Sequence, residues 1–147
     1  MTGDFESKLV EDVEARGFSS VWVFDDEEGL PDFAYTVGLS FSCRHPELVV
    51  VGLPYRASVG ILHEAAGRAV EGTELRVGDR VQDVALGFDV LIGSVDRGFM
   101  EANMRQAAGF AGGSSRGARQ ILWPDRRGIF PGEPGFDSRL AGRQDLR

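Results

Sequence analysis

Residues 33–40 of the chain read Phe-Ala-Tyr-Thr-Val-Gly-Leu-Ser. In an extended strand, successive side chains point to opposite faces of the sheet, so this stretch has two unlike faces. One face is bulky and apolar, with Phe33, Tyr35, Val37 and Leu39. The other carries the small residues Ala34, Thr36, Gly38 and Ser40. The bulky face predicts a core strand, and the small face favours a closely packed helix, with close approach of a ligand as the alternative.

Further strands are predicted on both sides of this one. Residues 20–24 are rich in β-branched and aromatic side chains and form a hairpin with it across the acidic turn at 25–31. Residues 48–53 are a continuous apolar run, which is typical of a strand buried on both faces. The remaining strands are expected at 74–77, 88–95 and 119–123, with an extended edge segment at 81–86.

About three helices are predicted between these strands. Apolar side chains at four-residue spacing predict the first helix, which ends at Gly17. Pro54 opens the second, whose alanine-rich stripe ends at Gly72. Asp96 caps the third, which covers residues 97–108. The fold class is therefore α+β, with a curved, mixed, mainly antiparallel sheet and about three helices.

The composition predicts one compact domain. The chain has 147 residues, of which 42% are hydrophobic and 27% charged, the balance of a soluble globular protein. We expect the domain to cover residues 1–137 and to be followed by a flexible tail at 138–147. No apolar run is long enough to span a bilayer and no targeting signal is recognisable, so a cytoplasmic location is expected.

The charges argue against a nucleic-acid partner, because the net charge is −7 and phosphate contacts need clustered positive charge. They are also unevenly distributed along the chain. Residues 1–34 hold ten acidic and two basic side chains, whereas residues 114–147 hold four acidic and seven basic ones. Of the 16 basic residues, all except Lys8 are arginines, whose planar fork suits carboxylate and phosphate groups. The C-terminal end is therefore the place to look for an anionic ligand.

His45 is the most plausible proton carrier, since its reference pKa lies near neutrality. Cys43, His45 and Glu47 alternate along the chain, which leaves a metal site or a Cys43 thiolate nucleophile as alternatives. No metal site is predicted, because the chain lacks the usual histidine spacings. The glycine-rich residues 109–117 match no phosphate-binding motif and are predicted to be a flexible loop.

Residues 123–136 look least like generic scaffold. They place Trp123, Phe130 and Phe136 among prolines and glycines, with Asp125 and Arg126 close by. Rigid aromatic side chains with a polar fringe line pockets and interfaces, although they also cover sheet edges. The segment is therefore a candidate wall of a ligand pocket.

Five motifs, in order along the chain, resemble the bacterial domain of unknown function 4262. They are FAYTVGL at 33–39, HPEL at 45–48, GLP at 52–54, QILWPD at 120–125 and GIFPGEPG at 128–135. The resemblance implies a stand-alone bacterial cytoplasmic domain, and it implies no reaction, cofactor or partner.

Two functional hypotheses follow. In the first, the His45 loop, the small strand face and residues 123–136 converge on a pocket for a small ligand, with anionic ligands among the candidates. The catalytic candidates are His45, Glu47 and Asp125, and the ligand-binding candidates are Tyr35, Thr36, Gly38, Trp123, Phe130 and Arg126. Whether such a site is enzymatic stays open. A flavin at a homodimer interface is a variant that rests on fold analogy, and no cofactor is predicted.

In the second hypothesis, the acidic N-terminal face binds a protein partner, as in an immunity-like or regulatory module.

Overall fold

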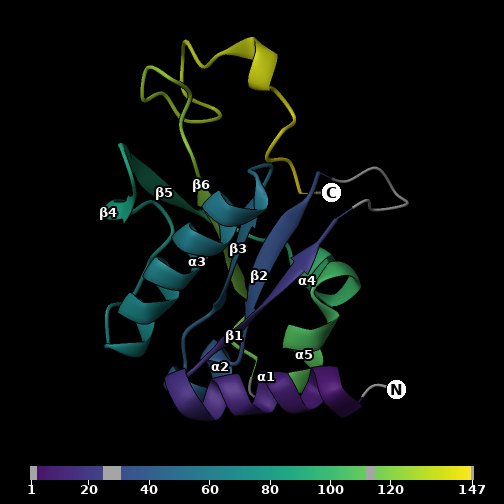
Figure 1. The fold of residues 1–147 in the computed structure, drawn as a ribbon. Coiled ribbons are helices and arrows are strands. Elements are labelled where there is room, and N and C mark those ends of the chain that lie inside the picture. The colour runs from purple at the N-terminus through teal and green to yellow at the C-terminus, as the bar shows by residue number, and fades with distance from the viewer. Residues whose placement is uncertain (1–2, 25–30, 112–114, 147) are drawn as a thin grey trace.

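The computed structural model describes residues 3–24, 31–111 and 115–146, which form a six-stranded sheet with helices on both faces (Figure 1). The strand order is β1-β2-β3-β6-β5-β4. The strands are β1 (Ser19–Val23), β2 (Phe33–Val37), β3 (Glu47–Val51), β4 (Arg80–Ala85), β5 (Phe88–Ser94) and β6 (Ala118–Leu122).

The sheet consists of two antiparallel halves joined by one parallel pair. Strands β1, β2 and β3 pair antiparallel in sequence order, and so do β4, β5 and β6. The halves meet where β3 pairs parallel with β6, with Glu47 opposite Ala118. The predicted α+β class with a mixed, mainly antiparallel sheet is confirmed.

Five α-helices are present in the described residues, more than the three expected. They are α1 (Gly3–Arg16), α2 (Leu39–Cys43), α3 (Tyr55–Val70), α4 (Arg97–Asn103) and α5 (Arg105–Ala111). The predicted third helix is broken into α4 and α5 at Met104, whose backbone is non-helical. The short α2 was not expected, and residues 38–40 do not continue the predicted strand, because Gly38 adopts a positive φ of 104° and redirects the chain after β2.

The two faces of β2 belong to different hydrophobic cores. Its small face, with Ala34, packs with α3, whose alanines Ala65, Ala66 and Ala69 allow close approach. Its bulky face, with Phe33, Tyr35 and Val37, packs with Leu9 of α1 and with α4 and α5. Helix packing on the small face is therefore correct, and Ala34 and Thr36 are both 0% exposed beneath it.

Three other expectations need comment. The strand expected at 74–77 is absent, and these residues form a loop and turn before β4. The predicted flexible loop at 109–117 begins too early, since α5 runs through Gly109 to Ala111. The acidic turn at 25–31 and the middle of the glycine-rich stretch lie largely outside the described residues.

Residues 138–146 pack against the sheet. They begin with a 3-10 turn, η2 (Ser138–Leu140), and continue to Gln144, which is 6% exposed. The Gln144 side chain accepts a hydrogen bond from the Trp123 backbone N–H at 2.9 Å and donates one to the Trp123 carbonyl at 2.8 Å. Flexibility of this tail stays a prediction, but Gln144 is hydrogen-bonded to the backbone of Trp123, directly after β6.

None of the described helices is both long enough and apolar enough to cross a membrane.

Candidate functional site

Glu47, at the start of β3, binds the turn between β2 and α2. Its carboxylate is 0% exposed and accepts a hydrogen bond from Thr36 Oγ1 at 2.7 Å. It also accepts from the backbone N–H groups of Gly38 at 3.2 Å, Leu39 at 3.1 Å and Ser40 at 3.1 Å. Burial raises the pKa of Glu47 to about 7, and these four hydrogen bonds oppose that rise. The arrangement holds the first turn of α2 in place.

His45 is held as a neutral imidazole. Its Nδ1 lies 2.7 Å from the Pro46 carbonyl, and its Nε2 lies 3.0 Å from the Leu75 backbone nitrogen. A carbonyl only accepts and a backbone N–H only donates, so Nδ1 carries the proton and Nε2 accepts. Burial lowers the pKa of His45. Both ring nitrogens are thus committed to the backbone.

Asp125 organises the segment that follows β6. Its side chain accepts from the backbone N–H groups of Arg127 at 2.9 Å, Ile129 at 3.0 Å and Asp137 at 3.0 Å. Burial acts to raise the pKa of Asp125, but these hydrogen bonds outweigh it and lower the pKa. The carboxylate therefore closes the loop between residues 125 and 137.

The remaining predicted aromatic residues are also bonded or packed inside the molecule. Tyr35 Oη donates to Gln106 Oε1 at 2.6 Å, and burial raises the pKa of Tyr35 to about 12. Trp123 Nε1 donates to the Val51 carbonyl at 2.8 Å, and Phe130 is 1% exposed. These contacts explain why such residues stand at these positions without requiring a ligand.

The predicted pocket does not form from its three proposed segments. His45 and Glu47 stand at the start of β3, whereas Trp123 follows the end of the parallel strand β6. Trp123 lies five positions after Ala118, which is opposite Glu47, and five steps along an extended chain span roughly 16 Å. The two ends line separate cavities, one of about 290 Å³ at Cys43 and His45 and one of about 470 Å³ at Asp125, Arg126 and Phe130. The structure thus brings Thr36, Gly38 and Glu47 together, and Asp125, Arg126 and Phe130 together.

The cavity beside His45 offers little reactive chemistry. The Cys43 thiol donates to the Leu39 carbonyl at 3.4 Å, and burial raises the pKa of this thiol. A raised pKa disfavours the thiolate, which is the nucleophilic form. Neither Cys43 nor His45 therefore has the environment of an activated nucleophile and its base.

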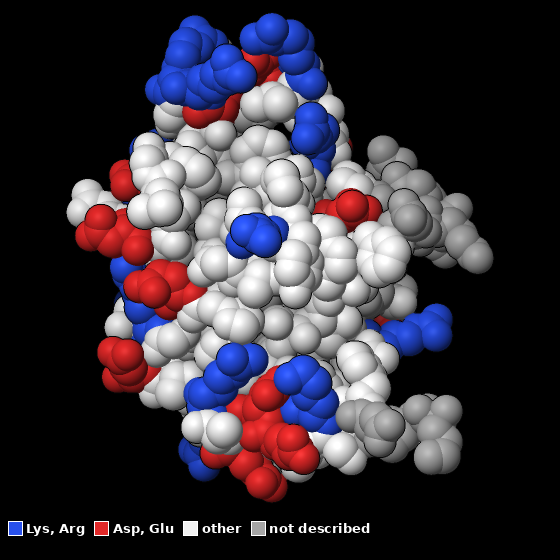
Figure 2. Space-filling model, in the orientation of Figure 1, with Lys and Arg blue, Asp and Glu red and all other residues white. Residues whose placement is uncertain are grey.

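A further cavity, lined mainly by arginines, lies at the C-terminal end, and we call it the arginine pocket. It measures about 320 Å³ and is lined by Arg126, Asp137, Arg139, Leu140 and Arg143. Figure 2 shows Lys and Arg side chains gathered over this end of the molecule. Arg126 also lines the neighbouring cavity of about 470 Å³, which contains Phe88 and Phe130.

Two carboxylates near the arginine pocket are paired with arginines, whereas two arginines of the pocket make no ion pair with the described residues. Arg139 pairs with Asp137 at 2.9 Å, and its hydrogen bonds lower the pKa of Asp137 to about 2. Glu133 pairs with Arg80 at 3.1 Å and accepts from the Phe130 backbone N–H. Within the described part of the chain, the guanidinium groups of Arg126 and Arg143 have no hydrogen bond or ion pair.

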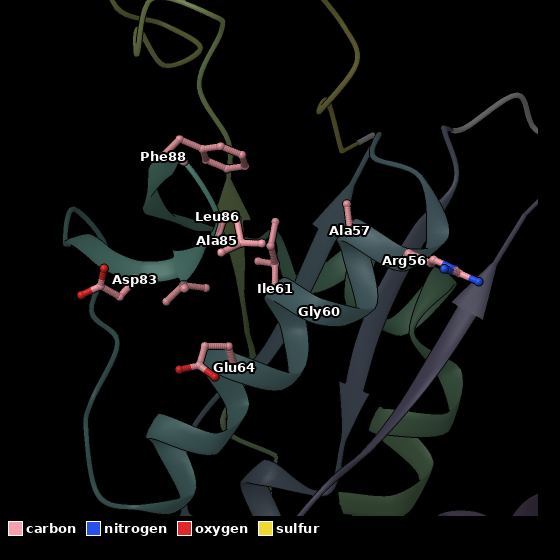
Figure 3. A pocket seen from close by; sticks show the side chains of 11 residues that line it. Arg56, Ala57, Gly60, Ile61, Glu64, Asp83, Ala85, Leu86 and Phe88 are labelled. Carbon is pink, nitrogen blue, oxygen red and sulfur yellow. The ribbon is translucent and has the colours of Figure 1, made fainter.

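The sequence prediction included Arg126 but missed Arg139 and Arg143. The excess of basic residues after position 114 was the available signal, but both arginines fell in the presumed tail. A further cavity was missed entirely. It measures about 680 Å³ and lies between α3 and the β4–β5 hairpin (Figure 3). Its two walls come from separate parts of the chain, so no local motif marks it.

No group of three or more His, Cys, Asp or Glu side chains among the described residues is placed to hold a metal ion. In a comparison with known families, the model described as Domain of unknown function (DUF4262) matches residues 12–137. No curated protein matches the chain, and no solved structure matches it.

Proposed function

The chain belongs to the family described as Domain of unknown function (DUF4262) and, since that description names no activity, we propose from the side chains that the protein binds a small anionic ligand in the arginine pocket. The observation that carries the proposal is that three arginines line one cavity whose sole acidic lining residue in the described chain, Asp137, is already paired with Arg139. This leaves the cavity with an excess of positive charge.

The chemistry of arginine supports an anion rather than a neutral ligand. A guanidinium donates two parallel hydrogen bonds to a carboxylate or phosphate, and such charge-assisted bonds are stronger than neutral ones. The guanidinium groups of Arg126 and Arg143 have their donors available, because neither group bonds to a side chain or carbonyl among the described residues. Asp125 holds the backbone N–H groups beside Arg126, at residues 127 and 129, so one end of the pocket is fixed by the fold.

Titration with pyrophosphate and with citrate at constant ionic strength, followed by calorimetry, tests the proposal. We expect saturable binding, and we expect Arg126→Gln combined with Arg143→Gln to weaken it at least about tenfold. Arg97→Gln, on α4, is the matched control because Arg97 is exposed and lines none of these cavities. No binding up to about 10 mM, or equal losses in the control, contradicts the proposal.

A protein-interaction role is the second candidate. The exposed side chains Glu6, Glu11 and Glu14 lie on α1, together with Phe5 and Val10, which are 45% and 43% exposed. Acidic side chains around exposed apolar ones suit a basic protein partner, and such binding weakens as salt is added. Salt-independent retention of partners in a pulldown would argue against this role.

The cellular location and the oligomeric state of the protein are part of the same proposal. A bacterial cytoplasmic location fits the family resemblance and the free cysteine Cys43. Native mass spectrometry with absorbance on freshly purified protein reports a retained anion, a flavin and a homodimer in one measurement. Cell fractionation tests the location.

A further inference from the structure

The cavity between α3 and the β4–β5 hairpin has the dimensions of a small-molecule site. It measures about 680 Å³, within the usual range of roughly 300–1,000 Å³ for ligand pockets. Ala57, Gly60 and Ile61 line it from α3, and Val84 to Phe88 line it from the hairpin (Figure 3). It is separate from the arginine pocket, with which it shares no lining residue.

Its walls are apolar, and part of that apolar surface faces solvent. Leu86, at the hairpin turn, is 99% exposed, and Phe88 is 36% exposed. Ile61 and Val84 are buried at the base of the cleft. A ligand with an apolar body that lies against these side chains removes their surface from water, which favours binding.

The charged side chains at this cleft are mainly acidic. Glu64 lines it from α3 and Asp83 lines it from the hairpin, whereas the Arg56 side chain points away from the cleft in Figure 3. Glu64 Oε1 lies 3.7 Å from Nη2 of the half-buried Arg68, a long contact that leaves the exposed Glu64 carboxylate open to a second cation. The Asp83 carboxylate has no hydrogen bond or ion pair to any other described residue.

The backbone of β4 places Asp83 unusually. Its φ is 64°, in the left-handed region, and the β4–β5 register shifts between Val81 and Ala85. An irregularity of this kind redirects a side chain relative to a regular strand. The irregular strand thus puts a carboxylate without a partner at the rim of an apolar cleft.

We propose that this cleft binds an organic amine, with its apolar body against Ile61, Leu86 and Phe88 and its ammonium group beside Glu64 and Asp83. The apolar walls supply contact area and the two carboxylates select a cation. Because the arginine pocket takes no part in this site, the proposal stands or falls separately from the binding of an anion.

Three indole compounds of similar shape and different charge test the selectivity. Tryptamine is a cation at neutral pH, tryptophol is neutral, and indole-3-acetate is an anion. In an NMR titration of the full chain with ¹⁵N-labelled backbone amides, we expect tryptamine to shift signals from residues 57–64 and 83–88. We expect its dissociation constant to be at least about fivefold lower than that of tryptophol, with indole-3-acetate the weakest.

Substitutions that remove one charge distinguish the contribution of the carboxylates from that of the apolar walls. Glu64→Gln and Asp83→Asn should each weaken tryptamine binding at least about threefold and leave tryptophol binding unchanged. Asparagine tolerates the left-handed backbone at this position, so the second change preserves the fold. Glu71→Gln is the control, since Glu71 caps α3 outside the cleft.

Filling the cleft tests the location. A Cβ on Gly60 meets no atom within 4 Å, so Gly60→Leu extends into the cleft without a clash at its base. It should abolish the binding of tryptamine and tryptophol together. Gly67→Leu, on the same helix and also open around its Cβ, should change neither. Equal binding of the three indoles, unchanged binding in Asp83→Asn, or binding that survives Gly60→Leu would overturn the proposal.

Discussion

Three polar side chains in the family motifs bind backbone groups of this chain itself. Glu47 holds the N–H groups of the β2–α2 turn, His45 bridges Pro46 and Leu75, and Asp125 closes the loop after β6. Buried polar side chains that complete backbone hydrogen bonding are costly to lose. Their position in motifs is accounted for by folding, and a catalytic role for them stays a prediction.

Glu47→Gln should destabilise the protein by about 2 kcal/mol. Glutamine keeps one acceptor oxygen, but its amide N–H₂ would face backbone donors from residues 38–40 that need an acceptor. Urea denaturation at pH 7 measures the effect. Glu71→Gln, at an exposed position, should change stability little, and an equal effect of both changes would contradict this explanation.

His45→Gln should cost less stability at low pH than at high pH. Because burial lowers the folded-state pKa of His45 below its ordinary value of 6.5, protonation favours the unfolded chain. The stability that His45 supplies is therefore present above pH 6.5 and is lost as the pH falls below that value. The difference in unfolding free energy between the natural protein and His45→Gln should narrow between about pH 7.5 and 5.5. A constant or widening difference would rule out the neutral imidazole.

At the scale of elements, hydrophobic patterning predicts most of the sheet and helix α3. The two-faced stretch is placed correctly over residues 33–37, because a period of two assigns each side chain of β2 to a face, but Leu39 and Ser40 lie in α2 and not in the strand. The short α2 and the break at Met104 were not predicted, since neither carries a strong periodic signal. Gly38 marks the start of α2, but a glycine after a strand fits many turns.

Two glycine-to-alanine changes should have opposite effects on stability. Gly60→Ala should stabilise the protein by about 0.5–1 kcal/mol, because alanine favours an α-helix and its Cβ has open space. Gly38→Ala should destabilise it by more than about 1 kcal/mol. Its φ is 104°, and a Cβ there would lie 2.5 Å from Val13 Cγ2. Thermal unfolding of both variants checks the signs, and a stable Gly38→Ala protein would show that the turn can rearrange.

At the scale of the whole molecule, the sequence predicts the fold class but does not predict which distant segments of the chain lie side by side. The charge count pointed to the C-terminal end, yet the pocket there needs Arg126 and Arg143 on one surface. The parallel pairing of β3 with β6 separates the His45 and Trp123 motifs, and no local pattern reveals that register. The cleft between α3 and the β4–β5 hairpin similarly depends on how the hairpin lies beside the helix.

Gln144→Ala should destabilise the protein by about 2 kcal/mol. The change leaves the buried N–H and C=O of Trp123 without their side-chain partners and loosens residues 138–146 from the sheet. Urea denaturation measures the loss, and a red shift of tryptophan fluorescence should accompany it. Gln82→Ala, on the exposed edge of β4, should have little effect. Unchanged stability of Gln144→Ala would show that the tail contributes nothing to folding.

On either side of the parallel pair β3–β6, the chain passes through the same order of elements. Residues 3–51 give a helix, two strands, a helix and a strand, and residues 55–122 repeat that order, with α4 and α5 in place of the second helix. Corresponding first helices cover opposite faces, since Leu9 of α1 lies in one core and Ile61 of α3 in the other. In the strand order, β1, β2 and β3 on one side of this pair correspond to β4, β5 and β6 on the other. The sheet is therefore built from two halves of similar element order, which residues 52–54 join into one chain.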